Sequence, residues 1–321
     1  MVPASGGEGA VGNMKIRKRM GWLVLMSLLC MALEQASSVK YVGLCHSVQV
    51  CARALLNAAG MLDEYKDRMD ELKWKTAGIN HMGWLLEISH KGKDLYPEIK
   101  KRAAKRVKAA RKGWEDKFGD MVRLEMMRHF GYYVTESSEH SAEYYPYWIK
   151  SQHPELIEEF HIPLDEYPRR CVRQIERWES RRKEIVENHS LDHKKTHEYG
   201  SFIMEAIVTD KPAKIGGNVR NGGLIPNLPE KAIVEVPCLV DRNGVQGCHV
   251  GELPEQLAAL CRSHINVHLL TVEAALTRKK ERIYQAAMLD PHTSAELTLD
   301  QIVSLCDDLI EAHGEYLPKY S

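Results

Sequence analysis

Two residues of this chain could bind a metal, and each lies in a short segment bounded by glycines. Cys45 falls within residues 43–49 and His81 within residues 78–84. Thiolate sulfur and imidazole nitrogen are ligands for soft and borderline metals. Structural zinc sites need four closed ligands, commonly as Cys-x-x-Cys or His-x-x-x-His pairs, and neither residue belongs to such a pair. Two ligands far apart in sequence therefore predict an open metal site where two elements meet.

Each of these residues also has a purely structural interpretation. A lone cysteine such as Cys45 is commonly a buried apolar thiol. His81 could be a core histidine with both ring nitrogens satisfied, and its neighbour Asn80 could be a turn former. Metal ligation and core packing are both compatible with the residue types alone.

Five blocks of the sequence occur in an order that is specific to one family. They are Cys45-His46-Ser47, Asn80-His81, residues 135–144, residues 217–221 and residues 234–238. Together they resemble glycoside hydrolase family 4, the NAD- and manganese-dependent glycosidases. The resemblance runs from about Cys30 to Ser321, and Cys45-His46-Ser47 is most similar to the α-galactosidase branch.

The resemblance implies a role for nine residues. Cys45 and His81 would be the metal ligands, and Tyr144 would be the base at C2 of the sugar. His46 stands where some relatives have an aspartate that protonates the leaving group, and histidine can donate a proton near neutral pH. The residues that would bind substrate are Asn80, Glu139, His140, Asn218 and Arg220. Tyr145 and Tyr147 are alternatives to Tyr144, and all three could instead pack with Trp148.

The chemistry that the family implies differs from that of ordinary glycosidases, which use two carboxylates. NAD takes a hydride from C3, which acidifies the proton on C2. A base removes that proton, the aglycone leaves by elimination, water adds, and the hydride returns. A tyrosine base needs its pKa lowered, which a nearby Mn²⁺ or other divalent cation would do. The cation also acts as a Lewis acid on the C2 and C3 oxygens.

The fold expected from the resemblance is a helix-rich α+β fold like the C-terminal domain of lactate and malate dehydrogenases. It would keep only the last strand of a Rossmann domain, residues 39–44. The glycine-rich turn that seats a pyrophosphate is not found, since the glycines of residues 4–9 follow no apolar strand. We therefore expect a C-terminal catalytic portion over residues 30–321 and an unassigned tail or misread gene start over residues 1–29. We also expect no NAD-dependent hydrolysis by the isolated chain.

Hydrophobic periodicity gives a coarse secondary structure for the rest of the chain. Helices are predicted within residues 55–72, 95–130, 171–188, 262–289 and 299–313. Strand character is found at residues 207–208 and 233–236, and turn signals at residues 216–218 and 221–223.

Composition excludes little. Lys+Arg and Asp+Glu both number 44, so no net field attracts nucleic acid or membrane. The basic run over residues 100–112 could be a nucleic-acid patch, but it lacks aromatic stacking partners, which favours a solvated helix face. The eight scattered cysteines favour a reducing, cytoplasmic location. Residues 15–38 resemble a secretory signal, which is the alternative.

We therefore predict a glycosidase acting on a small carbohydrate, without nucleic-acid or membrane partners, and forming a homo-oligomer. One alternative is a degenerate, non-catalytic homologue that keeps the metal site. Another is a metal-dependent dehydrogenase, which the expected fold also permits.

Overall fold

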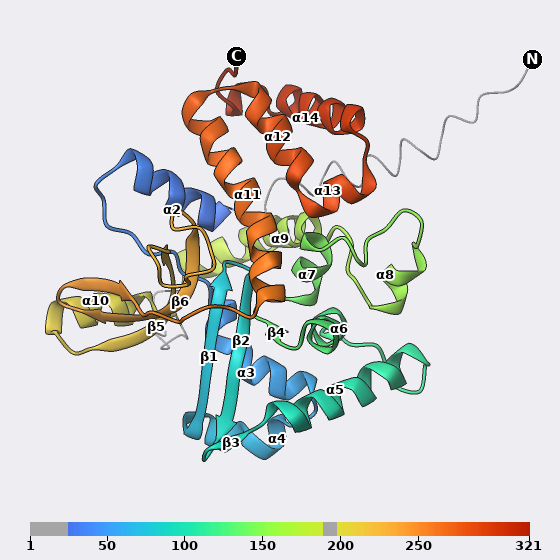
Figure 1. Cartoon of the computed structure of the whole chain (residues 1–321), viewed down its shortest axis with the longest axis vertical. Helices are drawn as coiled ribbons and strands as arrows, with labels where there is room; N and C mark the ends of the chain where they lie inside the picture. The colour runs from blue at the N-terminus through green and yellow to red at the C-terminus, as the bar shows by residue number, and fades with distance from the viewer. Residues whose placement is uncertain (1–24, 189–197) are drawn as a thin grey trace, which may run out of the picture.

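The computed structural model describes residues 25–188 and 198–321. Helices predominate in this part of the chain, with a sheet at its centre (Figure 1). The strands are β1 (Leu72–Ile79), β2 (Met82–His90), β3 (Lys93–Asp94), β4 (Tyr133–Val134), β5 (Ala213–Arg220), β6 (Ile233–Asp241) and β7 (Gly244–Gly247). The α-helices are α2 (Leu25–Ala36), α3 (His46–Ala58), α4 (Leu62–Tyr65), α5 (Tyr96–Arg111), α6 (Met121–Phe130), α7 (Ser138–Tyr144), α8 (Glu155–Glu159), α9 (Glu166–Glu187), α10 (Gly200–Thr209), α11 (Glu255–Thr277), α12 (Lys280–Leu289), α13 (Pro291–Glu296) and α14 (Leu299–His313). The predicted helix-rich α+β fold is confirmed.

The sheet is antiparallel and has the strand order β3-β2-β1-β6-β5, with β4 beside β2 and β7 beside β6. Strands β1 and β2 form a hairpin in which Ile79 pairs with Met82. Asn80 and His81 alone therefore make the connecting loop. The hairpin meets β6 where Gly78 lies opposite Glu235, which places the loop at the middle of the sheet.

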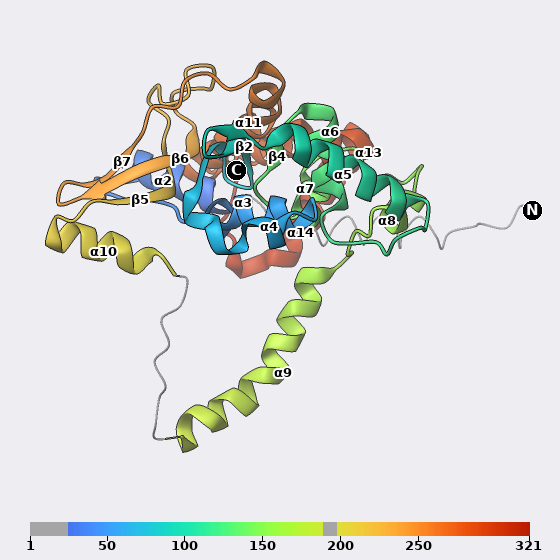
Figure 2. The same cartoon turned by 90° about the horizontal axis from the view of Figure 1, so that it is seen from below.

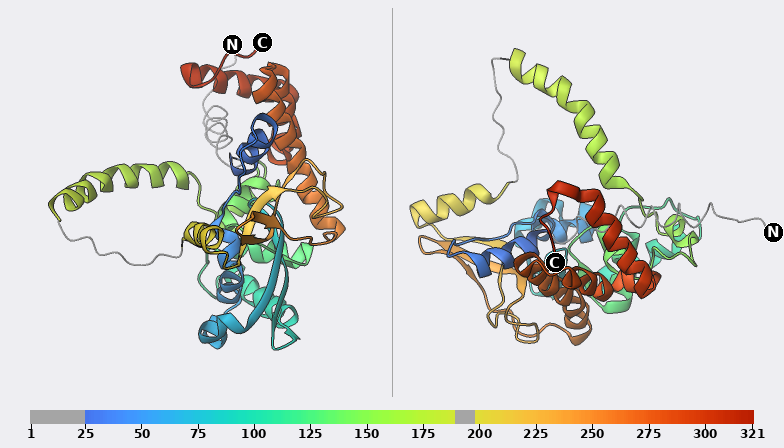
Figure 3. Two further views of the ribbon diagram at one scale, coloured as in Figure 1. Left: turned by 90° about the vertical axis from the view of Figure 1, so that its left-hand side faces the viewer. Right: turned by 90° about the horizontal axis from the view of Figure 1, so that it is seen from above.

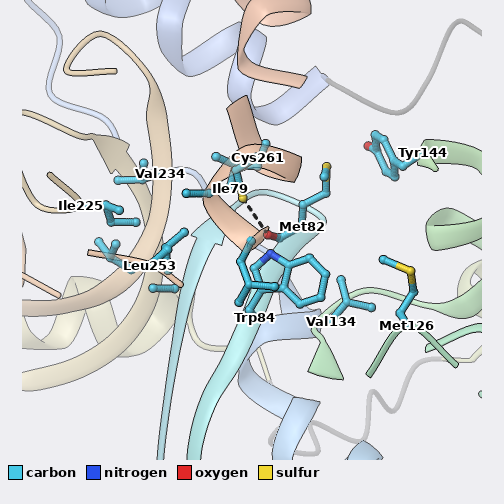
Figure 4. Close-up of a cluster of buried hydrophobic side chains, with 14 of the residues drawn as sticks. Ile79, Met82, Trp84, Met126, Val134, Tyr144, Ile225, Val234, Leu253 and Cys261 are labelled. Atoms are coloured by element: carbon cyan, nitrogen blue, oxygen red, sulfur yellow. Dashed lines mark hydrogen bonds between the residues drawn. The ribbon is translucent and has the colours of Figure 1, made fainter. Parts of the chain in front are cut away.

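Both faces of the hairpin are covered. Trp84 and Leu85 are adjacent in β2, fully buried, and belong to two different clusters of apolar side chains. This is expected because successive side chains of a strand point to opposite faces. The Trp84 cluster contains residues of α11, whose Cys261 thiol donates to the Met82 carbonyl oxygen over 3.6 Å (Figure 4). The Leu85 cluster contains side chains of α3, α5 and α6.

Helix α2 belongs to the folded body. Its Cys30 and Met31 are buried with Ile233 of β6 and Val272 of α11. Residue 30, the predicted start of the domain, thus lies inside this helix. The rest of the signal-like stretch, up to residue 24, lies outside the described residues, as does most of the predicted tail. None of the helices within the described ranges is long and apolar enough to cross a membrane.

Several predicted elements differ from the structure. Residues 95–130 form two helices, because the chain leaves α5 at Lys112 and Gly113, where Gly113 has a φ of 70°. The stretch 55–72 ends in a short 3-10 helix, Lys66–Glu71, and then enters β1. Residues 207–208, predicted as strand, lie in α10. The segment 39–44, predicted as the last strand of a Rossmann domain, is not a strand. It makes a single β-bridge, between Gly43 and Asn218 of β5.

The glycines of residues 216–217 lie inside β5 and not in the predicted turn. A Cβ atom on Gly216 would come within 2.8 Å of Val48, and one on Gly217 within 2.9 Å of Val42. These glycines therefore allow α3 and the segment before it to lie close against the strand. The second predicted turn, at residues 221–223, is present as a turn after β5.

Helix α9 extends away from the body of the protein (Figures 2 and 3). It has 22 residues, and none of them is buried. The apolar side chains of Val172, Ile175 and Trp178 are all more than half exposed. The nine residues after Asn188 that lead toward α10 lie outside the described ranges.

Candidate metal centre and catalytic site

Three segments of the chain bring a thiol, an imidazole and a carboxylate together. Cys45 is the residue before α3, two positions after the bridge between Gly43 and Asn218. His81 occupies the hairpin loop with a φ of 63°, a left-handed conformation that a tight two-residue loop imposes. Glu136 follows β4 closely. One ligand atom from each of these three residues lies within 4.8 Å of the other two.

The distances fit a shared divalent cation. Glu136 Oε2 lies 3.8 Å from Cys45 Sγ and 3.4 Å from His81 Nε2. Ligand atoms about 2.0–2.3 Å from one metal are separated by distances of this order. Three protein ligands leave coordination positions for substrate oxygens or water. Manganese prefers oxygen ligands, so the carboxylate suits it better than the thiol and imidazole alone would.

The protonation states of the cluster reflect its burial. Burial raises the pKa of the Cys45 thiol to about 11, and the Glu235 and Glu136 carboxylates add to the shift. Burial lowers the pKa of His81. Burial alone would raise the pKa of Glu136, but His81 and the Ser137 N–H bring it below its usual range. The cluster without a cation thus holds a neutral thiol beside a carboxylate, and binding of a cation would favour loss of the thiol proton.

Tyr144, at the end of α7, joins this cluster. Its hydroxyl lies 3.2 Å from His81 Nδ1, so His81 contacts Tyr144 through one ring nitrogen and Glu136 through the other. Tyr145 is buried against other groups and Tyr147 is 44% exposed, and no described contact joins either to His81. Burial raises the pKa of Tyr144 well above 10, and the Glu136 carboxylate raises it further. These contacts favour the protonated phenol, and a nearby cation would lower its pKa.

Two more predicted residues lie beside the cluster. The ring of His140 meets that of His81 edge to face, with centroids 5.0 Å apart, and its Nδ1 lies 2.8 Å from Ser137 Oγ. Asn80 is buried next to His81.

Asn218 lies behind the cluster and is fully buried. Its Nδ2 donates to the Gly43 carbonyl oxygen at 3.3 Å and to Glu235 Oε1 at 3.0 Å. Its described contacts are therefore with the protein interior.

The other predicted residues have their described contacts outside the metal cluster. His46 is exposed, with Nε2 2.9 Å from Glu198 Oε2 and its ring against Tyr199. Arg220 forms an ion pair of 3.0 Å with Glu34 of α2. Glu139 is partly buried on α7, where burial raises the pKa of its carboxyl. None of the three is among the described contacts of the metal cluster.

Two acidic residues were missed as site residues. Glu136 and Glu235 both lie in the sequence blocks that carried the family resemblance, but nothing in the local pattern marks Glu136. Glu235 stands in an otherwise apolar strand, and a charge within a buried strand is a signal that could have found it. Burial raises the pKa of Glu235 to about 7, against the opposing effect of the Asn218 and Asn80 amides.

Comparisons with known proteins bear on the identity of the chain. The family 4 glycosyl hydrolase C-terminal domain matches residues 76–293. The chain is 57% identical over 295 residues to an α-galactosidase of Bacillus subtilis (strain 168), covering 92% of this chain and 65% of that protein. It is 29% identical over 304 residues to an α-galactosidase of Rhizobium meliloti (strain 1021), covering 91% and 60%. The chain thus spans less than two thirds of the length of these relatives.

Solved structures show the same fold. A putative glucosidase from Bacillus subtilis superposes with a TM-score of 0.74 at 22% identity, covering 89% of this chain and 66% of that one. A 6-phospho-α-glucosidase from gut microorganisms, in complex with NAD and Mn²⁺, has a TM-score of 0.69 at 20% identity, covering 92% and 67%. The match of the domain over most of the chain, together with these relatives, shows that the chain belongs to family 4 of the glycosyl hydrolases.

Proposed function

We propose that this chain is the catalytic portion of a glycosidase that hydrolyses α-galactosides or related α-glycosides, with NAD and a divalent cation such as Mn²⁺ as cofactors. The observation that carries the proposal is the cluster of Cys45, His81 and Glu136 with the Tyr144 hydroxyl 3.2 Å from His81. The names of its relatives support an α-galactoside, and a structural neighbour that holds NAD and Mn²⁺ supports the cofactors.

Cys45, His81 and Glu136 would hold the cation. When bound, the cation would polarise the C2 and C3 oxygens of the sugar and NAD would accept the C3 hydride. The three side chains come from segments that are separate in sequence, so each is fixed by a different part of the fold. The remaining coordination positions would orient the sugar, which places its C2 near the Tyr144 side of the cluster.

Tyr144 would act as the base at C2. The proton on C2 passes to its phenolate oxygen, the electron pair forms a C1–C2 double bond, and the C1–O bond to the aglycone breaks. His46, the residue after Cys45, would protonate the leaving oxygen, and its contact with Glu198 would orient the ring.

Substrate contacts are proposed for two of the five residues predicted for this role. His140 and Glu139 lie on α7, the helix that carries Tyr144, and both are partly exposed. Asn80 and Asn218 are buried within the protein, and Arg220 is paired with Glu34.

The test uses a substrate that is already oxidised at C3, so that elimination can be followed without the hydride transfer to NAD. The full chain with Mn²⁺ is given 4-nitrophenyl 3-keto-α-galactoside, and release of nitrophenolate is followed. Wild type should eliminate nitrophenol, and Tyr144→Phe should be about 10²–10⁴-fold slower with unchanged Mn²⁺ binding. Tyr145→Phe, a buried neighbour without contact to His81, is the matched control and should retain the wild-type rate.

Equal rates with and without Mn²⁺, or in wild type and Tyr144→Phe, would overturn this assignment. Mn²⁺ binding without any elimination would instead favour the non-catalytic metal-binding homologue.

We also propose a homo-oligomer in the cytoplasm. The exposed apolar side chains of α9, and separately those of Met204 and Val208 on α10, support surfaces that a second copy would cover. Sedimentation of the full chain tests the homo-oligomer. A mass greater than that of one chain is expected, and the mass of a single chain would contradict it.

A further inference from the structure

Glu235 is a buried carboxylate that takes no direct part in the metal cluster. It lies in β6, is 1% exposed, and is therefore out of reach of a substrate. The described residues that bring ligand atoms within 4.8 Å of one another are Cys45, His81 and Glu136, without Glu235. Its contacts nevertheless lead to each of these three residues by a separate route.

The first route runs to Cys45. Glu235 Oε1 accepts a hydrogen bond of 3.0 Å from Asn218 Nδ2. The same Nδ2 donates to the carbonyl oxygen of Gly43, and the two backbones exchange hydrogen bonds of 3.0 Å and 2.8 Å. Gly43 is two residues before Cys45, so the carboxylate fixes the amide that holds this segment.

The second route runs to His81. Glu235 pairs with Gly78 across the β1–β6 contact, and Gly78 is two residues before Asn80. Asn80 and His81 are the two residues of the hairpin loop. Glu235 thus lies opposite the end of β1 that leads into the loop bearing His81.

The third route runs to Glu136. A Cβ atom on Gly83 would lie 2.9 Å from Glu235 Oε2 and 3.0 Å from Thr135 Oγ1, so the two oxygens flank the same point of the β2 backbone. The Thr135 N–H donates to the Gly83 carbonyl oxygen at 2.8 Å. Thr135 is the residue before Glu136. A glycine at position 83 is what allows these groups to approach.

Burial of the Glu235 carboxylate lowers the stability of the fold. In the described part of the chain Glu235 has no ion-pair partner, and a buried carboxylate without a cation costs several kcal/mol of stability. A neutral side chain of similar size would be cheaper for folding. The contacts with the segments that carry the three ligands offer a functional reason for the carboxylate.

We propose that Glu235 is a positioning residue, which holds the segments bearing Cys45, His81 and Glu136 in the separation that a divalent cation requires. The inference rests on the proposed function, because it presupposes that these three residues bind a metal.

The experiment titrates the full chain with Co²⁺ and follows the thiolate-to-cobalt charge-transfer absorption, which reports on Cys45, with Mn²⁺ as competitor. Glu235→Gln removes the charge and replaces one carboxylate oxygen with an NH₂ donor, so a single acceptor oxygen remains for the Asn218 amide and for the groups around Gly83. It should weaken Co²⁺ and Mn²⁺ binding about 10–100-fold and change the absorption band. The metal-free protein, melted at pH 8, should keep its Tm or gain stability.

Glu125→Gln is the matched control, because Glu125 is also a buried glutamate but is paired with Arg128 on α6. It should lower the Tm and leave metal affinity unchanged. Asn218→Ala removes the first route only and should weaken binding in the same way as Glu235→Gln. The double variant should lose no more affinity than Glu235→Gln alone, because the Asn218 contact is one of the routes that Glu235→Gln already disturbs.

The inference is overturned if Glu235→Gln binds Co²⁺ within a factor of three of wild type. It is also overturned if its loss of affinity comes with a lowered Tm, as a merely structural role would give. If Glu235→Gln does not fold, Asn218→Ala is judged by Co²⁺ affinity alone, because the loss of its buried hydrogen bonds lowers the Tm in any case. Wild type that binds neither metal would refute the proposed function itself, and the inference with it.

Discussion

Arg123 offers a test of whether burial or the number of ion pairs decides what a charged side chain contributes to this fold. Its side chain is 7% exposed. The guanidinium donates to the carbonyl oxygens of Val134 and Thr135 at 2.9–3.1 Å and to Asp120 Oδ1 at 2.9 Å. It also lies over the Tyr133 ring, 4.0 Å from its centroid. These contacts fix the strand that leads to Glu136.

The change Arg123→Met keeps the length of the aliphatic stem and removes the charge. It leaves two buried carbonyl oxygens without these donors, at about 1–3 kcal/mol each, and Asp120 without its cation. The sum is limited by relaxation, so we expect a loss of about 3–5 kcal/mol in the free energy of unfolding, as for other broken buried pairs.

The control is Arg102→Met in α5. Arg102 pairs with two carboxylates, Glu98 and Glu64, but its side chain and theirs are 36–49% exposed. Exposed pairs contribute about 0–1 kcal/mol, so this variant should lose less than about 1 kcal/mol despite having more ion pairs. Urea unfolding of the metal-free chain gives both values from the shift in midpoint at equal slope. The reasoning is refuted if Arg123→Met loses no more stability than Arg102→Met.

Two further predictions concern the metal centre and its surroundings. Mn²⁺ binding should weaken at least about 10-fold, with unchanged helical content, in each of the variants Cys45→Ser, His81→Ala and Glu136→Gln. Serine in place of the exposed Cys248 is the control and should leave Mn²⁺ binding unchanged. Equal affinities of wild type and the three site variants, measured by calorimetric titration, would refute the site. Burial raises the pKa of Glu235 from 4.5 to about 7, so between these pH values the folded chain keeps a proton that the unfolded chain releases. The free energy of unfolding should therefore fall by up to about 3 kcal/mol, through this group, as pH rises from 4.5 to 7. The difference in unfolding free energy between Glu235→Gln and wild type should grow over that range, and parallel pH profiles would contradict the shift.

The helical part of the fold was accessible from sequence because its signal is local. The helices α9 and α14 carry apolar residues at helical spacing among charges, and the structure has them close to the predicted ranges. The single helix predicted over residues 262–289 is divided between α11 and α12, because the chain leaves α11 at Arg278, which has a φ of 61°. The hairpin of β1 and β2 was missed. Residues 83–86, Gly-Trp-Leu-Leu, are apolar on both faces because both faces are buried, so they lack the alternation that marks a half-buried strand.

The candidate site was accessible only where a motif marked it. Cys45, His81 and Tyr144 were named from the family resemblance, and the structure brings them together. Glu136 lies 91 positions from Cys45 in sequence, and no spacing rule connects a lone carboxylate to a distant thiol. Its place in the cluster depends on the pairing of β4 with β2, which only the folded chain reveals.

The projecting helix α9 has a consequence for how this protein melts. A helix without buried residues gains nothing from the core, so its order rests on its own hydrogen bonds and on local ion pairs such as Glu166 with Arg170. Solitary helices of this length are marginal in water and lose their order gradually on heating. In a single copy of the chain, part of the helical signal therefore fades before the cooperative transition of the sheet and its covering helices. A single midpoint temperature therefore describes the unfolding of the sheet and its covering helices, and not that of α9.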